Sequence, residues 1–261
     1  MIIWLASYPR SGNTYLRFLI YSYFKGEINE TSVVDDYVKD VSISNEDMFK
    51  DKSRIYYAKS HFMYMKRHPF LKDTFAVVHL VRNPRDVMLS AVRYNKLLAN
   101  ESIEALSTSK EQIFRDRAYA VDFISNGGDP FWKDKYIGTL FQNYNSWKLT
   151  EKKYPYIYLT YEYLKKNPHD ALKKVLQLSE SIIDDDKIDF AISQCHIANM
   201  KKMEKREKKV NMENPFCSEL NTDIPFIGNG LSGQSLLFLG EDIEEMFKKK
   251  FNLYMKMLNY S

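Results

Sequence analysis

Residues 2–14 read Ile-Ile-Trp-Leu-Ala-Ser-Tyr-Pro-Arg-Ser-Gly-Asn-Thr, and this stretch decides the fold class. Residues 2–7 are a short apolar run that ends at a turn with Pro9 and Gly12, a pattern that predicts a buried strand. Residues 13–24 then place apolar side chains at helical spacing, and we expect a helix there. A buried strand, a tight turn and a helix are the opening unit of a parallel sheet.

The rest of the chain continues this alternation of strands and helices. Further strands are predicted at residues 55–58, 75–81 and 156–160, and further helices at residues 84–98, from residue 184 onward and at residues 241–258. Two less regular regions lie at residues 100–136 and 201–234. Because no repeat, low-complexity tract or flexible linker occurs, residues 1–261 are predicted to form one α/β domain, with a central parallel β-sheet flanked by helices.

Charge and cysteine content limit the class of protein. The chain has 261 residues, a net charge of +4 and a pI near 8.7. This mildly basic balance is too weak to indicate nucleic-acid binding, and it fits both a small polyanionic ligand and an ordinary mixed surface. Two cysteines, Cys195 and Cys217, cannot form a disulfide framework or a zinc site by themselves. We therefore expect free thiols in a reducing compartment.

The sequence does not predict secretion or membrane insertion. Arg10 and Arg17 interrupt the first apolar stretch before a signal peptide could form. No run of about 18 apolar residues occurs, so no transmembrane helix is expected. These features predict a cytoplasmic enzyme, and they leave its oligomeric state open.

The turn after the first strand is the first candidate binding site. Gly12 lets the backbone approach a ligand, and the N–H groups at the start of the next helix attract anions. Ser11 and Thr14 add hydroxyl groups, and Arg10 adds a permanent charge with a bidentate fork. No lysine precedes Thr14, so the turn is not a Walker A loop. It resembles a P-loop only in form, and it predicts an anion site.

A second group of polar residues follows the strand at residues 75–81. Arg82 stands at the carboxyl end of this strand, where parallel sheets place their ligands, and Ser90 follows eight residues later. The two side chains can share one anion if the chain turns back at Pro84. Alternatively, Arg82 pairs with Asp86 and caps the helix. The residues alone leave both interpretations open.

A third group follows the strand at residues 55–58. Lys59 and His61 are two residues apart, so an extended backbone projects both side chains to the same side. A neutral histidine accepts a proton near pH 7, and an ammonium group neutralises charge on a leaving group. A surface histidine beside an unrelated lysine is the alternative.

Together these motifs resemble the sulfotransferase family, in order as well as in residue type. Residues 8–15 resemble its 5′-phosphosulfate loop, residues 82–90 its 3′-phosphate motif, and residues 59–61 its Lys-Thr-His segment. Further along, residues 143–147 resemble its His-Val-x-Ser-Trp helix, residues 158–164 the strand that carries an adenine-contacting tyrosine, and residues 230–233 its late Gly-x-x-Gly loop. The resemblance therefore spans about residues 2–235, and the two phosphate motifs are the most specific.

The resemblance implies a donor, a reaction and a set of site residues. The donor would be 3′-phosphoadenosine 5′-phosphosulfate, with adenosine 3′,5′-bisphosphate as product, and the acceptor a hydroxyl or an amine of a small molecule or carbohydrate. His61 would be the base, Arg10 and Lys59 would stabilise charge, and no metal would be needed. The donor would contact the remaining candidates: Ser11, Gly12, Asn13, Thr14, Tyr15, Arg82, Ser90, Tyr161 and Gly230.

Several positions depart from the family pattern. Arg10 replaces the usual lysine, so it can stabilise a leaving group but not protonate it. Tyr15 replaces a tryptophan expected to stack on adenine. In the late loop the family's Arg-Lys-Gly becomes residues 228–230, Gly-Asn-Gly, which lacks an arginine for the 3′-phosphate. The family's Thr-Ser-Phe adenine contacts are weakened at residues 195–197.

Two other classes of function compete with a sulfotransferase. A P-loop nucleotide kinase would share the sheet, but the sequence offers neither a Walker lysine nor a clear Mg²⁺ carboxylate. A non-catalytic nucleotide-binding protein would explain the altered late loop, although Lys59 and His61 are retained. Candidates for an acceptor pocket, with a core role as the alternative, are residues 62–65, Phe131, Trp132 and Tyr136.

Overall fold

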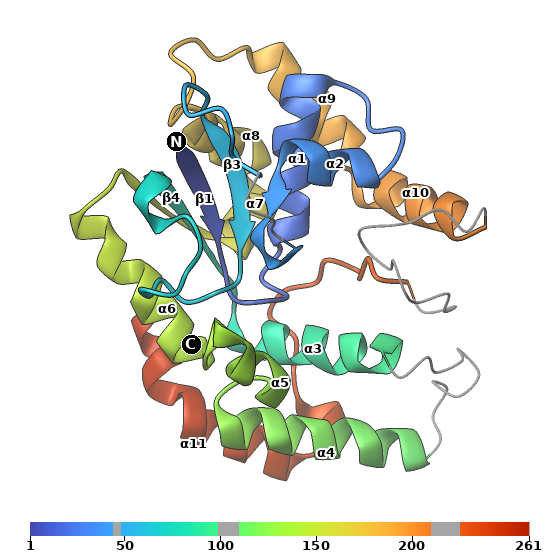
Figure 1. The fold of residues 1–261 in the computed structure, drawn as a ribbon. Helices are drawn as coiled ribbons and strands as arrows, with labels where there is room; N and C mark the ends of the chain where they lie inside the picture. Colours follow the sequence, from blue (N-terminus) through green and yellow to red (C-terminus); the bar gives the residue numbers. More distant parts are fainter. Residues whose placement is uncertain (44–47, 99–109, 210–224, 261) are drawn as a thin grey trace.

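Parallel strands form the centre of the structure. The structure is a computed structural model, and it describes residues 1–43, 48–98, 110–209 and 225–260. The described residues form a five-stranded sheet in the order β2-β3-β1-β4-β5 (Figure 1). The strands are β1 (Ile2–Ala6), β2 (Lys39–Asp40), β3 (Tyr56–Ser60), β4 (Thr74–Val81) and β5 (Tyr156–Thr160). Every neighbouring pair is parallel, which confirms the predicted sheet.

Helices cover both faces of this sheet. They are α1 (Asn13–Lys25), α2 (Ser32–Tyr37), α3 (Pro84–Leu98), α4 (Lys110–Asn126), α5 (Pro130–Trp132), α6 (Leu140–Lys148), α7 (Tyr161–Lys166), α8 (Pro168–Leu176), α9 (Asp185–Gln194), α10 (Ile197–Lys209) and α11 (Glu241–Met257). Short 3₁₀ or π turns lie at η1 (Val41–Ile43), η2 (Leu71–Asp73), η4 (Lys133–Ile137), η5 (Leu149–Lys152) and η6 (Leu237–Leu239). None of the helices in the described part combines the length and hydropathy that a membrane span requires.

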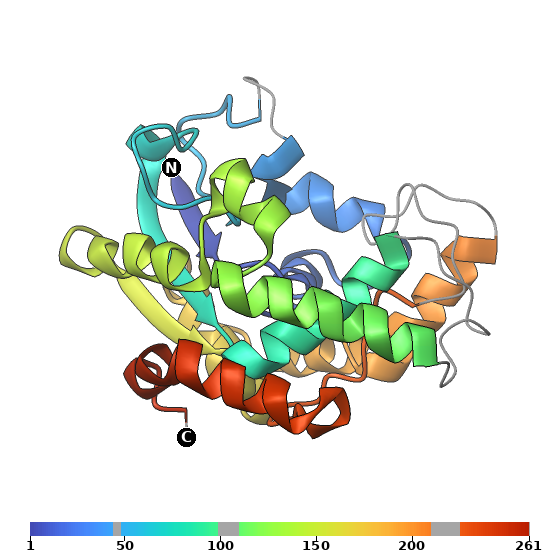
Figure 2. The same ribbon diagram turned by 90° about the horizontal axis from the view of Figure 1, so that it is seen from below.

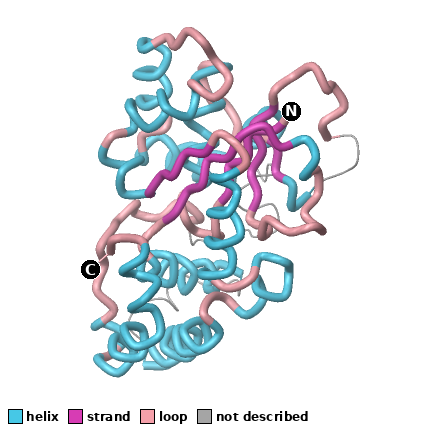
Figure 3. Tube along the Cα trace, turned by 90° about the vertical axis from the view of Figure 1, so that its left-hand side faces the viewer, coloured by secondary structure: helices cyan, strands magenta, loops and turns pink. Residues whose placement is uncertain are grey.

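The alternation of side chains along β1 explains the two layers of helices. Ile3 and Leu5 point to one face and pack with α1, α2, α8, α9 and α10. Ile2 and Trp4 point to the opposite face, where Trp147 of α6 covers them. Figure 3 shows the strands between two groups of helices. Since both faces are buried, the strand is apolar throughout, as its sequence predicted.

A further core lies below the sheet in Figure 1 and joins α3, α4, α5, α6 and α11. Phe123 of α4 and Phe247 of α11 are completely buried in it. Figure 2 shows these two helices side by side. The helix at residues 110–126 falls in the region 100–136 that the sequence pattern showed as less regular. Residues 99–109 and 210–224 lie outside the described part, and with them Cys217; Cys195 is a buried free thiol.

One strand was not predicted from the sequence. Strand β2 is only two residues long, and its charged side chains give no apolar alternation. It pairs with β3 so that Asp40 lies opposite Lys59. Strand β3 also runs to Ser60, two residues beyond its predicted end. Lys59 is therefore held on the strand itself, next to the edge strand that carries Asp40.

The strand order places a binding site at the carboxyl end of β1. The chain leaves β1 and adds β3 on one side, then returns to add β4 on the other. Where the chain adds strands first on one side of a strand and then on the other, the loops that follow the strands run in opposite directions and leave a crevice between them. The turn after β1, His61 after β3 and Arg82 after β4 all follow these three strand ends.

Two buried histidines should make the fold sensitive to acid. Burial, with the nearby charge of Lys148, lowers the pKa of His79 to about 3, and burial lowers the pKa of His68 to about 4. Each unfolded histidine binds a proton near pH 6.5, so stability is present above that pH and is lost as pH falls toward 4. The expected loss is about 1.4 kcal/mol per pH unit for each histidine.

Urea unfolding at pH 7 and pH 5 would measure this loss. We expect His79→Gln to reduce the difference in unfolding free energy between the two pH values by about 1.5 to 2 kcal/mol. His196 is exposed, so His196→Gln is the matched control and should leave the difference unchanged. Equal pH dependence in wild type and His79→Gln would show that His79 is not a buried neutral group.

Candidate functional site

A cavity of about 570 Å³ opens at the carboxyl ends of β1, β3 and β4. Segments far apart in the sequence line it, from the turn after β1 to the late loop at residues 226–234. Most of the residues predicted from the sequence are among its walls: Arg10, Gly12, Asn13, Thr14, Tyr15, Lys59, His61, Arg82, Ser90, Tyr161 and Gly230. The structure therefore brings together three motifs that the sequence could only place at separate strand ends.

The turn after β1 offers backbone donors to this cavity. Gly12 has φ 98° and caps α1, and a Cβ at this position would overlap the ring of Tyr161. Within the described residues, the N–H groups of Gly12, Asn13 and Thr14 donate to no protein acceptor. Such a row of N–H groups at a helix N-terminus binds anions.

The side chains of Ser11 and Asn13 contact other parts of the protein, although the motif predicted that both residues contact the donor. Ser11 is buried and faces a small space behind the turn, beside Tyr8 and Tyr144, instead of lining the cavity. The Asn13 amide donates to the Leu5 carbonyl at 2.7 Å and to the Ser7 hydroxyl at 3.0 Å. Asn13 thus ties the start of α1 to the end of β1 through its side-chain N–H groups, and its backbone N–H remains as a donor for a ligand.

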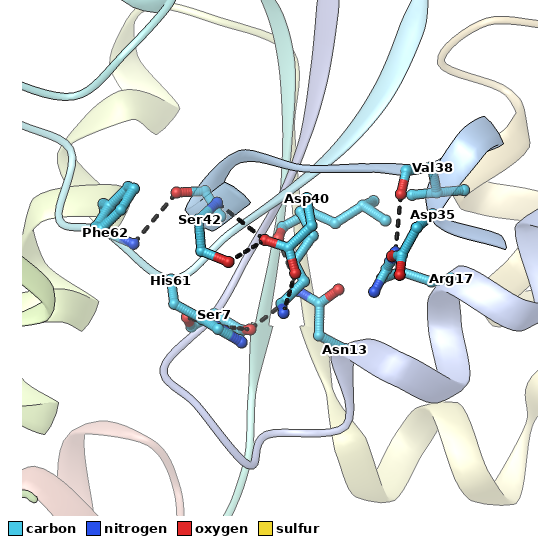
Figure 4. Close-up of polar contacts among 12 residues, drawn as sticks. Ser7, Asn13, Arg17, Asp35, Val38, Asp40, Ser42, His61 and Phe62 are labelled. Atoms are coloured by element: carbon cyan, nitrogen blue, oxygen red, sulfur yellow. Dashed lines mark hydrogen bonds and ion pairs between the residues drawn. The ribbon is translucent and has the colours of Figure 1, made fainter. Parts of the chain in front are cut away.

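His61 is held in one tautomer at the edge of the cavity. Its Nδ1 lies 2.8 Å from the Ser7 carbonyl oxygen, which only accepts, so Nδ1 carries the proton (Figure 4). Nε2 then keeps its lone pair, and no described residue donates to it. Burial, and then the charge of Lys59, lowers the pKa of His61 to about 3. His61 is therefore neutral at physiological pH.

Lys59 is paired with Asp40, a residue that sequence analysis did not single out. The Lys59 Nζ lies 2.5 Å from Asp40 Oδ2, and Asp40 also accepts from Ser42 (Figure 4). Burial alone would raise the pKa of Asp40, but the charges of Lys59 and Arg17 outweigh it and hold that pKa below its ordinary value. Asp40 is therefore charged, and its negative charge opposes the burial that lowers the pKa of Lys59.

A second ion pair lines the same end of the cavity. Arg17 of α1 pairs with Asp35 of α2 and also donates to the Val38 carbonyl at 2.9 Å (Figure 4). Charge near His61 is thus largely balanced, with two cations facing two carboxylates. Trp132 and Ile137 add apolar wall.

Arg82 also lines the cavity, and within the described residues it forms no ion pair with a carboxylate. Arg82 donates to the carbonyls of Arg10 at 3.0 Å and Leu231 at 2.9 Å, and its guanidinium lies 4.4 Å from the centre of the Tyr161 ring. The Arg10 Nε donates to Ser90 Oγ at 3.1 Å. Arg82 and Ser90 therefore do line one site, with Arg10 between them.

The alternative pairing of Arg82 with Asp86 is wrong. Asp86 is completely buried and accepts the backbone N–H groups of Gly233 at 2.9 Å and Gln234 at 3.1 Å. Its carboxylate fixes the late loop against α3 and leaves Arg82 to the cavity. An acid that looked like a helix-capping partner is in fact a loop anchor.

Two further cations in the wall were missed by the sequence analysis. Lys165 lies one helical turn after Tyr161, and its Nζ stands 4.8 Å from the centre of the Tyr15 ring. Arg93 lies one turn after Ser90 on α3. The i, i+3 and i, i+4 spacing from predicted residues was the available signal. Asp40 gave no such signal, because its partner is 19 residues away.

The predicted acceptor residues divide into two groups. Trp132 lines the cavity, whereas Phe131 and Tyr136 are 65% and 52% exposed and lie outside its walls. Phe62 and Tyr64 pack against the cores instead. Aromatic side chains at residues 62–65 are thus explained by packing, the alternative that the sequence had left open.

Comparison with known proteins identifies the family. The sulfotransferase domain matches residues 2–258 of this chain. The chain belongs to the sulfotransferase family. It is 21% identical to mouse sulfotransferase 1B1, over 95% of this chain and 82% of that protein. The predicted family and the predicted transferase class are therefore confirmed.

Solved structures show the same fold. Mouse sulfotransferase SULT7A1, complexed with PAP, superposes with a TM-score of 0.61 at 17% identity, over 96% of this chain and 84% of that one. Retinol dehydratase in complex with retinol and PAP gives a TM-score of 0.66 at 14% identity, over 98% and 81%. At such identities the likeness establishes the fold alone, and the roles of single residues in this sulfotransferase stay predictions.

The pair between Lys59 and Asp40 should contribute measurably to stability. We expect Asp40→Asn to lower the free energy of unfolding by about 2 to 3 kcal/mol, because it leaves a mostly buried ammonium without its partner. Lys52 and Asp73 form an exposed pair at 2.9 Å, so Asp73→Asn is the control and should cost less than about 1 kcal/mol. Urea unfolding would measure both losses. Equal losses would show that the buried pair contributes no more to stability than the exposed pair.

Proposed function

We propose that this sulfotransferase moves the sulfuryl group of 3′-phosphoadenosine 5′-phosphosulfate to a hydroxyl or amine of a small-molecule or carbohydrate acceptor. One observation carries the proposal: among the described residues, a single cavity brings together helix N–H groups without an acceptor, the Arg82 guanidinium, which forms no ion pair, and a neutral histidine. The first two features suit a ligand with several negative charges. The third suits removal of a proton from an acceptor.

The walls of the cavity fit a donor with two separate phosphate groups. The N–H groups of Gly12, Asn13 and Thr14 would hold the 5′ end, together with the Thr14 hydroxyl. Arg82 and Ser90 would hold the 3′-phosphate. The buried Arg82 Nε has no hydrogen-bond partner among the described residues, and an anion at this place would satisfy it. PAP, which two similar structures contain, carries both phosphates.

His61 is proposed as the base that takes the acceptor proton. The bond from Nδ1–H to the Ser7 carbonyl orients the ring and leaves Nε2 as the acceptor of that proton. Lys59 lowers the basicity of the ring, and negative charge brought by a bound donor would oppose that effect. The histidine would therefore be a stronger base once a donor is bound beside it.

Arg10 and Lys59 are proposed to stabilise negative charge during transfer. Arg10 stands between the turn after β1 and Ser90, so its charge acts on the donor from the 3′ side. Arginine cannot give up its proton at physiological pH, and its contribution is electrostatic. Lys59 has one N–H bound to Asp40, which leaves its other two for the transferred group. The donor supplies the sulfuryl group, and no metal is proposed.

The adenine would lie beside Tyr15, Tyr161 and the backbone of Gly230, which line one side of the cavity. Tyr161 already packs on Gly12 and under the guanidinium of Arg82, so it would act as a fixed wall. The acceptor would lie at the end of the cavity with His61 and Trp132. Retinol dehydratase binds retinol, a small molecule, and a small acceptor is proposed here by analogy.

A ligand comparison would test the donor class. Adenosine 3′,5′-bisphosphate at about 100 times its dissociation constant should stabilise the chain by about 2.7 kcal/mol, seen as a higher melting temperature, whereas ATP with Mg²⁺ should have little effect. Transfer of radiolabelled sulfate to a panel of hydroxyl and amine acceptors would test the reaction. Stabilisation by ATP with Mg²⁺ alone would support a nucleotide kinase instead. Binding of the bisphosphate without transfer to any acceptor would support the non-catalytic alternative.

The His61 assignment has its own test. We expect His61→Gln to lower turnover by about 10²- to 10⁴-fold while the affinity for adenosine 3′,5′-bisphosphate changes less than about twofold, because a base acts only on the reacting proton. Calorimetry and single-turnover transfer would measure the two quantities. His196→Gln, an exposed histidine outside the cavity walls, is the control. Near-normal turnover in His61→Gln with intact donor binding would show that another group takes the proton.

A further inference from the structure

Arg93 reaches the donor site from α3 without belonging to any of the motifs found in the sequence. It lies one helical turn after Ser90, so both side chains face the cavity. Its Nη2 donates to the carbonyls of Pro225 and Ile227, at 3.2 Å for the latter. The guanidinium is therefore fixed between α3 and the late loop.

Arg93 also fills the space that a side chain at position 228 would occupy. A Cβ built on Gly228 would overlap Nη1 of Arg93. The backbone of Gly228 lies outside the left-handed region, so its conformation does not itself demand glycine. Glycine at position 228 therefore leaves room for the Arg93 guanidinium, which comes from α3.

The Nη1 group has capacity for a ligand. No described residue accepts a hydrogen bond from it, and Arg93 forms no ion pair in the described part of the chain. The acid whose charge acts on Arg93 is Glu204, and its carboxylate already accepts the N–H groups of Phe226 at 2.5 Å and Ile227 at 3.0 Å and pairs with Lys208. Burial lowers the pKa of Arg93 and Glu204 only partly opposes this.

Arg10, Arg82 and Arg93 line the same cavity as Ser90 and are linked through shared neighbours. Arg10 donates to the Ser90 hydroxyl, and Arg82 donates to the Arg10 carbonyl. The Arg10 guanidinium lies 4.6 Å from the centre of the Phe226 ring, and Arg93 binds the carbonyls on either side of Phe226. Like charges in one cavity repel one another, and a dianion bound among them relieves that repulsion.

We propose that Arg93 is a second guanidinium ligand of the donor's 3′-phosphate and supports discrimination against nucleotides that lack this group. This rests on the proposed function, since it assumes a donor with a 3′-phosphate beside Ser90. Arg82 has already committed one N–H of each terminal nitrogen to backbone carbonyls. The Nη1 of Arg93 supplies charge and hydrogen-bond donors that Arg82 alone lacks, from the place where a longer side chain at 228 would otherwise stand.

Calorimetric titration with two ligands would test this assignment. Adenosine 3′,5′-bisphosphate and adenosine 5′-monophosphate differ by the 3′-phosphate alone. Arg93→Gln should weaken binding of the bisphosphate by at least about tenfold and that of the monophosphate by less than about twofold, because a charge-assisted hydrogen bond is lost only for the former. If Arg93 merely supported the late loop, both affinities would fall together, and that result would overturn the proposal. If both affinities stayed as in wild type, the proposal would be overturned too.

Two more variants sharpen the experiment. The double variant Arg93→Gln with Gly228→Arg returns a guanidinium to the same space from the loop, and it should recover the preference for the bisphosphate to within about threefold of wild type. If the double variant preferred the bisphosphate as weakly as Arg93→Gln alone does, the 3′-phosphate would not lie beside Arg93 and position 228. Arg67 is exposed and outside the cavity walls, so Arg67→Gln removes the same charge as a control and should leave both affinities unchanged.

The titrations also separate this inference from the proposed function. If wild type shows no preference for the bisphosphate over the monophosphate, the proposed donor is wrong. If wild type shows the preference and Arg93→Gln keeps it, only the role of Arg93 is wrong. Melting temperatures of all variants without ligand would establish that each one is folded.

Discussion

The amide of Asn13 donates to the Leu5 carbonyl and to the Ser7 hydroxyl, and these bonds fix where α1 begins relative to the end of β1. The rest of the site depends on this turn. Tyr8 extends from it into the lower core, where its hydroxyl accepts the N–H of Asp129. The Ser7 carbonyl orients His61, so the same turn that presents helix N–H groups also sets the tautomer of the proposed base.

Two buried carboxylates hold the late loop by its backbone. Asp86 and Glu204 each accept two N–H groups of the late loop, from α3 and from α10 respectively. An acid used in this way stabilises the loop while its charge is already compensated by hydrogen bonds. The loop therefore lies over a cavity lined by several arginines and is held there by its backbone N–H groups.

Charge is divided unevenly along the cavity. Near His61, Lys59 and Arg17 each pair with a carboxylate, and the charge of Asp40 opposes the effect of Lys59 on the histidine. Around Ser90, Arg82 and Arg93 donate to carbonyl oxygens, which satisfy N–H groups but leave the net charge in place. An anionic donor would be drawn to the second region and would present its other end to the first.

The sequence by itself determined the parallel sheet, the turn after β1 and the three groups of polar residues at strand ends. Hydrophobic periodicity and turn residues are local patterns, so each strand, helix or turn can be predicted from the few residues that form it. The residues alone left open whether Arg82 shares a site with Ser90 or pairs with Asp86, and in the structure Arg82 and Ser90 line one cavity.

Only the tertiary structure decided the partners of these groups. Asp40 meets Lys59 through a two-residue strand that has no periodic signal, and Arg93 meets Gly228 across 135 residues. Ser11 turned away from the cavity because the left-handed conformations at Arg10 and Gly12 set the direction of the turn. Contacts between distant segments depend on how the layers pack, and a single sequence records the residues that make such contacts but not their pairing.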